Sequence, residues 1–410
     1  MLSRSLRFSP GEDETFFQEL PAAAAVFMLR GDGEPYVSKT ANLRRRLQRL
    51  LGVPAEGSKR LNLRDRVREV EFSATGSDFE SQFLLYRILR QTFPKTYAAR
   101  LKLRAAPLIK LHLENPYPRA SVTTRLGKIK IDEISGNPDE ASSTGEYART
   151  STSLNSNLYY GPFPSRTVAE KFASDALDFF KMRRCVEDLH PDPSFPGCVY
   201  SEMKMCLAPC FKGCTDAEYD AEVARVQAFF DSGGQSLTGD FLNERERASA
   251  ELAFEEAAAI HGKIEKLKPV LGQLPEIVRR IDRLNAIIVQ PGAERGTISL
   301  FRFARATLQG PIPFTIEQSG EPQSMESRVA SAITVFPLAE TGSTAEQTEN
   351  LAILKRWYYR SSRTGEIFFA DEKGIWPLRR IVRGIGRIYR GEKAQEPASF
   401  SATDLIGPSS

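Results

Sequence analysis

At 410 residues, 41% of them apolar, the chain is too long for one ordinary hydrophobic core, and we expect about two to four domains. No run of about 18 apolar residues occurs, which excludes a membrane-spanning helix. The net charge is only +4, but Lys and Arg cluster in 36–70, 81–113 and 355–390, which favours a polyanionic partner over a set of solvated helix faces.

The first stretch with clear patterning is 20–104, which we expect to form a compact α/β module. A strand ending at Leu29 leads into a turn at Gly31-Asp32-Gly33 and a second strand from Tyr36, as in a hairpin. Asn42 is placed to cap the basic helix that follows. The other expected elements are a helix at 40–51, a strand at 67–73 and a helix at 78–93 capped by Ser77 or Asp78, after an irregular segment at 1–19.

The rest of the chain alternates between patterned and unpatterned segments. Residues 133–157 are rich in Ser, Thr, Gly and Asn and are predicted to be a disordered insertion. An amphipathic helix after Ser165 is expected to bury Val168, Phe172 and Ala176. Strands are expected at 107–113, 120–124, 284–289, 296–304, 314–317 and 366–370, helices at 216–231, 235–267, 346–359 and 378–390, and a loop at 318–346.

The hairpin and the helix after it resemble the GIY-YIG nuclease module of the UvrC family of excinuclease subunits. Ala25-Val26-Phe27 stands in place of Gly-Ile-Tyr, and Tyr36-Val37-Ser38 in place of Tyr-Ile-Gly. The resemblance implies DNA as the substrate, one divalent metal ion, and catalytic positions at Tyr36, Lys39 and Arg46. Three further arginines of the same helix are available to hold phosphate, namely Arg44, Arg45 and Arg49.

Several residues that this chemistry needs are changed. Phe27 lacks the hydroxyl of the first family tyrosine, Leu50 replaces a common helix tyrosine, and Tyr97 replaces a late asparagine. The metal-binding glutamate of the family aligns with Leu85, whose aliphatic side chain offers no oxygen to Mg²⁺. Glu80 is a poor substitute, because it lies roughly 140° around the helix from Leu85.

We therefore interpret the module as a degenerate, inactive nuclease in a DNA-binding or adaptor protein related to nucleotide excision repair. Two alternatives stay open. In the first, Glu34 or Glu80 supplies the missing carboxylate, binds Mg²⁺ and makes the protein a single-incision DNA endonuclease. In the second, the basic faces are incidental and the protein is an interaction scaffold without affinity for DNA.

All five cysteines lie within 185–214, in the pattern C-x12-C-x7-C-x3-C-x3-C. Thiolates ligate zinc or iron–sulfur clusters, and no signal peptide is evident, so we expect reduced thiols. The residues around them resemble the segment that follows the nuclease module in the UvrC family, which implies a [4Fe–4S] cluster; zinc and unliganded, packed thiols are the alternatives. The implied ligands are Cys185, Cys198, Cys206 and Cys210, with Cys214 additional.

The segment that begins Leu252-Ala253-Phe254-Glu255 resembles the UVR motif, a helical hairpin by which UvrC pairs with UvrB. The resemblance implies a UvrB-like partner, with Phe254 as an apolar anchor and Glu255 as an orienting charge. The Arg-Asp pair of the family is His261-Gly262 here, and a glycine inside a helix costs about 1 kcal/mol relative to alanine. An internal amphipathic helix is the alternative interpretation.

The resemblance ends near residue 268, and no counterpart of the RNase H-like nuclease or the helix–hairpin–helix pair of the family is evident in the sequence. Arg380, Arg383 and Arg387 recur on the polar side of an amphipathic helix, so we expect them to contact DNA. The run Trp357-Tyr358-Tyr359 either stacks on unpaired bases or belongs to the core.

Together these patterns predict a cytoplasmic, multi-domain α/β (α+β) protein with DNA, and no membrane, as its partner. The expected parts are a GIY-YIG-like module at 1–104, a linker domain with the insertion and the cysteines at 105–215, a UVR-like helical hairpin at 216–270, a mixed α/β domain at 271–395 and a tail at 396–410.

Overall fold

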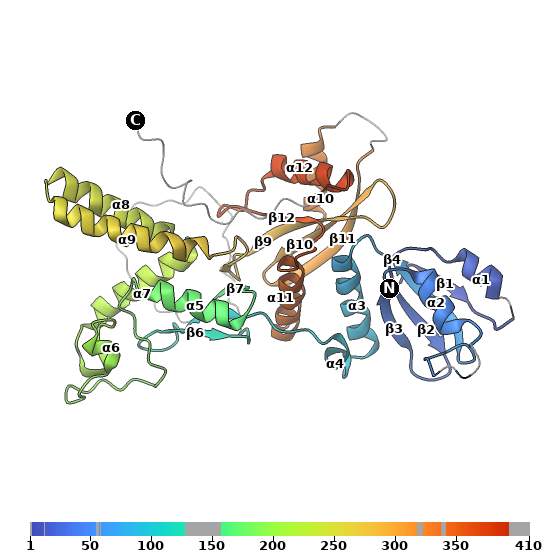
Figure 1. The fold of residues 1–410 in the computed structure, drawn as a ribbon, viewed down its shortest axis with the longest axis horizontal. Helices are drawn as coiled ribbons and strands as arrows, with labels where there is room; N and C mark the ends of the chain where they lie inside the picture. Colours follow the sequence, from blue (N-terminus) through green and yellow to red (C-terminus); the bar gives the residue numbers. More distant parts are fainter. Residues whose placement is uncertain are drawn as a thin grey trace.

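The computed structural model describes residues 2–11, 13–54, 57, 59–127, 157–317, 323–337 and 342–392. The predicted insertion, except for its last residue, and the predicted tail lie outside these ranges. Within them the strands form three four-stranded antiparallel sheets, joined and covered by helices (Figure 1). The mixed α/β, multi-domain class predicted from the sequence is confirmed.

The N-terminal sheet has the strand order β1-β4-β2-β3, and helices α1 and α2 pack on one of its faces. Asn42 caps α2 as predicted, because its Oδ1 accepts the backbone N–H of Arg45 at 2.9 Å. The expectation that 1–19 are irregular is wrong, since β1 pairs with β4 more than sixty residues downstream, a partner that local patterning does not reveal. The elements are β1 (Arg4–Arg7), α1 (Asp13–Glu19), β2 (Ala25–Gly31), β3 (Tyr36–Thr40), α2 (Leu43–Leu51) and β4 (Val67–Ala74).

Helix α3 (Asp78–Thr92) lies between the N-terminal and C-terminal sheets (Figure 1). One side contacts β2 and β3. The opposite side buries Phe79, Phe83 and Tyr86 in the main core, where the Phe79 ring lies 5.1 Å from the rings of both Phe301 and Trp357. Of the two caps considered from the sequence, Ser77 is the N-cap of α3, and the short helix α4 (Tyr97–Leu101) follows.

The middle sheet has the order β6-β5-β7-β8 and is covered by α5. The buried stripe of α5 is centred on Ala169, Phe172, Ala173 and Ala176, so Val168 lies beside the stripe and is 38% exposed; the expectation that Val168 is buried is wrong. The elements are β5 (Leu108–Leu111), β6 (Ala120–Thr123), β7 (Leu158–Gly161), α5 (Arg166–Leu177), α6 (Val199–Glu202), the 3₁₀ turn η1 (Pro209–Phe211), α7 (Asp216–Asp231) and β8 (Arg279–Arg280).

Two antiparallel helices, α8 (Gln235–Ala250) and α9 (Phe254–Gly272), form a hairpin that projects from the body of the molecule (Figure 1). The single helix expected over 235–267 is therefore wrong: the chain reverses between α8 and α9, where Leu252 adopts φ +60°. Gly234 separates α7 from α8 at φ +91° and packs closely on Leu271, so a side chain there would be both strained and crowded.

The C-terminal sheet has the order β11-β10-β9-β12. Helices α10 and α12 pack on one face, whereas α11 and the distant α3 pack on the other. The expected loop at 318–346 is wrong at α10, a short amphipathic helix with only two fully buried side chains. The elements are β9 (Asn285–Pro291), β10 (Thr297–Ala304), β11 (Thr307–Thr315), α10 (Met325–Thr334), α11 (Thr344–Tyr358), β12 (Glu366–Phe369) and α12 (Leu378–Tyr389).

Strand pairing and helix packing each join segments that the sequence analysis assigned to different domains. Strand β8 comes from the segment 271–395 yet pairs with β7 of the segment 105–215. Helix α3 comes from the segment 1–104 yet shares a core with the C-terminal sheet. The five-part division stays a prediction. In the described ranges no helix has the length and apolar character needed to cross a bilayer.

Gly384 allows α12 to lie close against β12, since a Cβ at this position would stand 2.4 Å from Cζ of Phe368. We expect Gly384→Ala to lower the free energy of unfolding of the C-terminal part by about 1–3 kcal/mol, because the helix must shift. Urea denaturation followed by tryptophan fluorescence measures this part, because both tryptophans, Trp357 and Trp376, lie in it.

The matched control is Gly386→Ala on the same helix. Its Cβ would meet only the end of the flexible Arg390 side chain, at 3.3 Å. We expect this variant to be unchanged or up to about 1 kcal/mol more stable, since alanine favours the helix. Equal destabilisation by both substitutions would show that close approach to Phe368 is not what requires glycine at 384.

Candidate functional site

Strand β3 divides the predicted catalytic residues between the two faces of the N-terminal sheet. Successive side chains of a strand point to opposite faces. Tyr36 packs in the core beneath α2 together with Phe27, whereas Val37 packs in the core that contains α3. Lys39 lies on the same face as Val37 and reaches α3. Tyr36 and Lys39 are therefore on opposite faces.

The face of the N-terminal sheet that α2 covers, called the α2 face below, brings together Tyr36 and Arg46. Arg46 Nη2 donates a hydrogen bond to the Tyr36 hydroxyl at 3.0 Å. The Phe27 ring is fully buried 6.1 Å from the Tyr36 ring, and Leu50 is buried in the same core. Of the predicted catalytic groups, this face holds the Tyr36 hydroxyl and the Arg46 guanidinium, and in the described part of the chain no carboxylate hydrogen-bonds to either.

The opposite face of the sheet, against which α3 packs, is called the α3 face below. It holds the position that aligns with the metal-binding glutamate of the family. Leu85 is half-buried and packs in the main core, on the other side of the sheet from Tyr36. Tyr97, at the other changed position, donates a hydrogen bond to Glu349 Oε1 at 2.9 Å. Burial raises the pKa of Tyr97, and Glu349 acts in the same direction. Tyr97 thus anchors α4 to α11.

The two carboxylates considered as substitutes for Leu85 have other partners. Glu34 Oε1 forms an ion pair with Arg100 at 2.6 Å. Glu80 is 7% exposed and accepts hydrogen bonds from the Gly76 amide at 3.0 Å and from Ser299 Oγ at 3.3 Å. Burial raises the pKa of Glu80, although these two hydrogen bonds oppose the rise. Neither carboxylate hydrogen-bonds to Tyr36 or Arg46.

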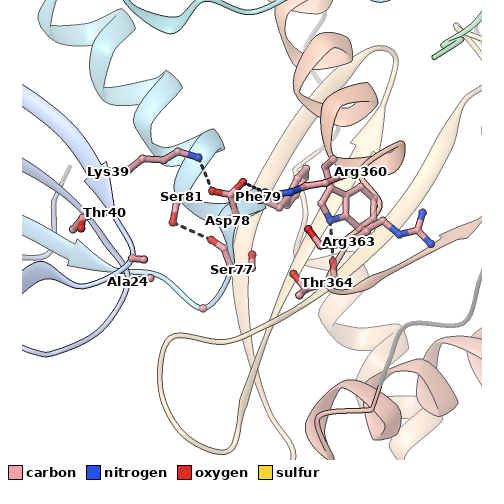
Figure 2. A pocket seen from close by; sticks show the side chains of 14 residues that line it. Ala24, Lys39, Thr40, Ser77, Asp78, Phe79, Ser81, Arg360, Arg363 and Thr364 are labelled. Atoms are coloured by element: carbon pink, nitrogen blue, oxygen red, sulfur yellow. Dashed lines mark hydrogen bonds and ion pairs between the residues drawn. The ribbon is translucent and has the colours of Figure 1, made fainter. Parts of the chain in front are cut away.

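A cavity of about 460 Å³ opens on the α3 face, between the N-terminal sheet and the loop that follows α11. Figure 2 shows Lys39 and Arg360 approaching Asp78 from opposite sides. Lys39 Nζ lies 2.6 Å from Asp78 Oδ1, and Arg360 pairs with Oδ2. Burial raises the pKa of Asp78, but Lys39 and Arg360 outweigh it and leave the pKa below its usual value. Asp78 is thus held ionised between two cations.

Sequence reasoning considered Asp78 only as a helix cap and missed this cluster. Asp78 and Leu85 are seven residues apart, which places them only about 20° apart around the helix, so the spacing alone indicates a shared face. Arg360 comes from a loop 282 residues later, and no local pattern connects it with Asp78.

The three arginines of α2 predicted to contact DNA differ in their surroundings. Arg45 and Arg49 are exposed. Arg44 is half-buried, and its Nε donates a hydrogen bond to the Leu20 carbonyl at 2.8 Å. Arg44 therefore also fixes the chain before β2, and the exposed cations of this helix are Arg45 and Arg49.

The three arginines of α12 that the sequence predicts to contact DNA also differ in their surroundings. Arg380 and Arg383 are exposed. Arg387 donates from Nε and Nη2 to the two oxygens of the buried Glu366, at 2.8 and 2.6 Å. The nearby Trp357 is 6% exposed and donates its indole N–H to the Thr364 carbonyl at 2.9 Å. This tryptophan is a core residue, as one of the two sequence interpretations held.

The five cysteines lie around α6 and η1, and none forms a disulfide. Burial raises the pKa of Cys206 to about 11, and the nearby thiols of Cys185, Cys210 and Cys198 act in the same direction. For Cys214, burial and the acidic residues Glu218 and Asp216 raise the pKa, and Cys210 acts in the same direction. We call Cys185, Cys198, Cys206 and Cys210 the four grouped thiols, because the first, second and fourth all act electrostatically on Cys206.

A buried arginine ties the cysteine segment to the middle sheet. Arg183 is 1% exposed, and its guanidinium donates to the carbonyls of Tyr117 and Glu187, each at 2.8 Å. It also donates to Cys185 Sγ at 3.4 Å, and the Ala208 amide donates to Cys206 Sγ at 3.3 Å. Two of the four grouped sulfurs thus accept N–H hydrogen bonds.

Comparisons with known proteins identify the relatives of this chain. A family model described as the UvrC/Cho excinuclease middle domain matches residues 135–229, a range that contains all five cysteines. UvrABC system protein C of Rickettsia canadensis is 25% identical over 300 residues, and that of Idiomarina loihiensis is 23% identical over 259 residues. The chain is UvrC-like.

The similarity to these relatives is partial. The matched regions cover 72% and 63% of this chain, but only 42% and 38% of the two relatives. The UvrC-like chain therefore spans about two fifths of the length of the curated relatives it matches. No solved structure matches it.

The donor set of the UvrC-like cysteine group suits an iron–sulfur cluster better than a hard cation. Sulfur ligands and N–H hydrogen bonds to those sulfurs are the features by which proteins hold and tune such clusters. In the described ranges no three His, Cys, Asp or Glu side chains are arranged closely enough to hold a metal ion. The residues that would hold a cluster are Cys185, Cys198, Cys206 and Cys210.

The tip of the hairpin formed by α8 and α9 exposes apolar side chains. Leu252 is 71% exposed and Phe254 is 65% exposed, at the reversal between α8 and α9. Glu255 is exposed in the first turn of α9. The two predicted partner-binding residues are thus at the end of the hairpin that points away from the body (Figure 1).

Proposed function

We propose that this UvrC-like chain is a DNA-binding adaptor related to nucleotide excision repair, and that its first module does not cut DNA. The observation that carries the proposal is the division made by β3. Tyr36 and Arg46 lie on one face of the sheet, while Lys39 and the leucine at the metal position lie on the other. Hydrolysis of a phosphodiester with one metal ion needs these groups around a single phosphate.

The carboxylate geometry supports the same proposal. Asp78 is the acidic group that shares the α3 face with Leu85, and it is already bound by Lys39 and Arg360. A hard divalent cation would have to displace both cations to use it. The exposed arginines of α2 and α12 need no metal to bind phosphates, since each contact releases counterions.

Purified protein is expected to bind duplex DNA with an affinity that falls steeply as salt rises, and to leave supercoiled, damaged and branched substrates unnicked with Mg²⁺ or Mn²⁺. Fluorescence anisotropy measures the binding and gel electrophoresis the nicking. The double variant Arg45→Gln/Arg49→Gln should bind less tightly, with a salt slope smaller by about two.

Two other results would contradict this proposal in different ways. Metal-dependent nicking that disappears in Tyr36→Phe would establish the endonuclease alternative. The absence of any DNA affinity at low salt would establish the scaffold alternative. A catalytically silent control, Arg295→Gln in the exposed turn before β10, should change neither binding nor nicking by more than about twofold.

We further propose that the four grouped cysteines hold a [4Fe–4S] cluster. The sulfur-only donor set and the hydrogen bonds from Arg183 and Ala208 to two of the sulfurs support it. A bound cluster would tie η1 and α6 to the loop before α6, and so would stabilise the segment that connects the middle sheet to α7.

Anaerobically prepared protein is expected to contain iron and sulfide and to absorb broadly at about 400 nm. Cys206→Ser should remove the absorbance and most of the iron, because Cys206 lies beside the three other grouped thiols. Cys214→Ser is the matched control and should keep both. Stoichiometric zinc without iron or sulfide would overturn the cluster in favour of the zinc alternative.

We propose that the hairpin tip binds a UvrB-like partner through Phe254 and Glu255. The exposure of Leu252 and Phe254 supports the proposal, because apolar side chains at the centre of an interface provide most of its binding energy.

Phe254→Ala is expected to weaken binding of a UvrB tail peptide about tenfold or more, as measured by calorimetric titration. Ile375→Ala, another change at an exposed apolar residue but far along the chain from the hairpin, is the control and should bind like the parent. Equal binding by the Phe254→Ala variant would exclude the tip as the partner site.

A further inference from the structure

A separate group of cations lies where the segment after α9 meets the end of α11, the loop before β12 and the start of α12. Its members are Arg279, Arg363 and Arg380, and all three act electrostatically on one carboxyl group, that of Glu276. None of them belongs to the α2 face or pairs with Asp78. In Figure 2 the guanidinium of Arg363 points away from the Lys39–Asp78 cluster.

Two of these guanidinium groups are fixed on aromatic rings. The Arg279 guanidinium lies 4.5 Å from the centre of the Phe369 ring. The Arg363 guanidinium lies 5.2 Å from the Trp357 ring and 4.9 Å from the Tyr358 ring. Arg279 Nε also donates to the Glu276 carbonyl at 3.2 Å, and Arg363 Nη1 donates to the Tyr358 carbonyl at 3.4 Å. Stacking holds each guanidinium in place and leaves its other N–H groups available at the edge.

The same two arginines lack a direct counterion. Both are half-buried, yet within the described ranges neither has a carboxylate oxygen within 4.0 Å. Burial lowers the pKa of Arg279 and that of Arg363. Half-buried charges of this kind are usually paired, so the arrangement leaves a place for an anion.

The surrounding groups are mostly hydrogen-bond donors. The Tyr358 hydroxyl is buried and makes no hydrogen bond of good geometry, although the Ile277 amide and Arg363 lie beside it. Tyr358 itself is 6% exposed. The acidic groups that face the cluster are Glu276, Glu366 and Glu372, and burial raises the pKa of Glu276. A buried hydroxyl without an acceptor is costly unless a ligand or water supplies one.

We propose that Arg279, Arg363 and the Tyr358 hydroxyl form a phosphate-binding site that holds one backbone phosphodiester of a bound DNA strand. A planar guanidinium matches two phosphate oxygens, and two stacked guanidinium groups with a hydroxyl donor match the charged oxygens of a phosphodiester. Arg380, exposed on α12 and followed one turn later by Arg383, continues the cationic surface along the strand. The DNA part of this inference rests on the proposed function.

The test measures DNA affinity of the full chain by anisotropy over a range of salt concentrations. Arg363→Gln and Arg279→Gln are each expected to weaken binding about tenfold and to reduce the salt slope by about one. Arg380→Gln, which leaves the core untouched, should weaken binding in the same direction. Glu276→Gln should tighten binding, because it removes the carboxylate that competes with phosphate. Arg295→Gln is the matched control and should bind like the parent.

The outcomes separate the inference from the proposed function. Parent protein that binds DNA, with unchanged affinity and salt slope in Arg363→Gln and Arg279→Gln, would overturn the site and leave the proposed function standing. Parent protein without DNA affinity would overturn both. Thermal denaturation identifies any variant that fails to fold, in which case Glu276→Gln, a change of nearly equal size at a half-buried position, decides.

Inorganic phosphate distinguishes a strand site from a site for a free anion. We expect millimolar phosphate to compete only weakly with DNA in the parent and not to stabilise the protein measurably. Tight binding of inorganic phosphate that depends on Arg363, with DNA affinity unaffected by the same variant, would assign the site to a free anion and overturn the strand assignment.

Discussion

Helix α3 is the element on which the arrangement of the molecule depends, because it is buried by two sheets at once. Its Phe79, Phe83 and Tyr86 side chains complete the core of the C-terminal sheet, while its other side contacts β2 and β3. Burying an aromatic side chain of this kind contributes about 1.5–3 kcal/mol. The N-terminal module therefore cannot move relative to the C-terminal sheet without exposing this aromatic face.

The packing of α3 between two sheets also determines which side chains lie beside the predicted metal position of the first module. The side of α3 that faces the N-terminal sheet carries Leu85 and Asp78, and the C-terminal part supplies Arg360 to the same carboxylate. At this face, where a nuclease would hold a metal ion and a phosphate, the ion pairs of Asp78 with Lys39 and Arg360 line the cavity of about 460 Å³. In the function proposed above, phosphate binding falls to the exposed arginines of α2 and α12 and to the stacked arginines beside Tyr358.

Elements with local signals could be predicted from the sequence. The Asn42 cap, the Ser77 cap and the amphipathic α12 each depend on residues within a few positions of one another, and each occurs as expected. Strand β1 was missed because its partner β4 is distant in the chain. The break between α8 and α9 was missed because no glycine or proline marks it; Leu252 instead takes the left-handed conformation.

In the candidate sites, too, contacts between residues distant in the chain could not be predicted from local sequence patterns. The family resemblance predicted Tyr36, Lys39 and Arg46 as catalytic positions, but it could not show that alternate residues of β3 face different helices. The resemblance predicts four cysteines as ligands and sets Cys214 apart, which stays a prediction, whereas the Arg183 anchor has no signal in the sequence. Contacts between segments hundreds of residues apart, such as Asp78 with Arg360, follow from packing rather than from pattern.

The most direct measurement is a titration of the full chain with Mn²⁺ followed by electron paramagnetic resonance, comparing the parent with Asp78→Asn. We expect the two proteins to bind Mn²⁺ equally weakly, because Lys39 and Arg360 already neutralise this carboxylate and Leu85 offers no ligand. A stoichiometric Mn²⁺ site in the parent that is lost in Asp78→Asn would contradict a module that holds DNA without a metal.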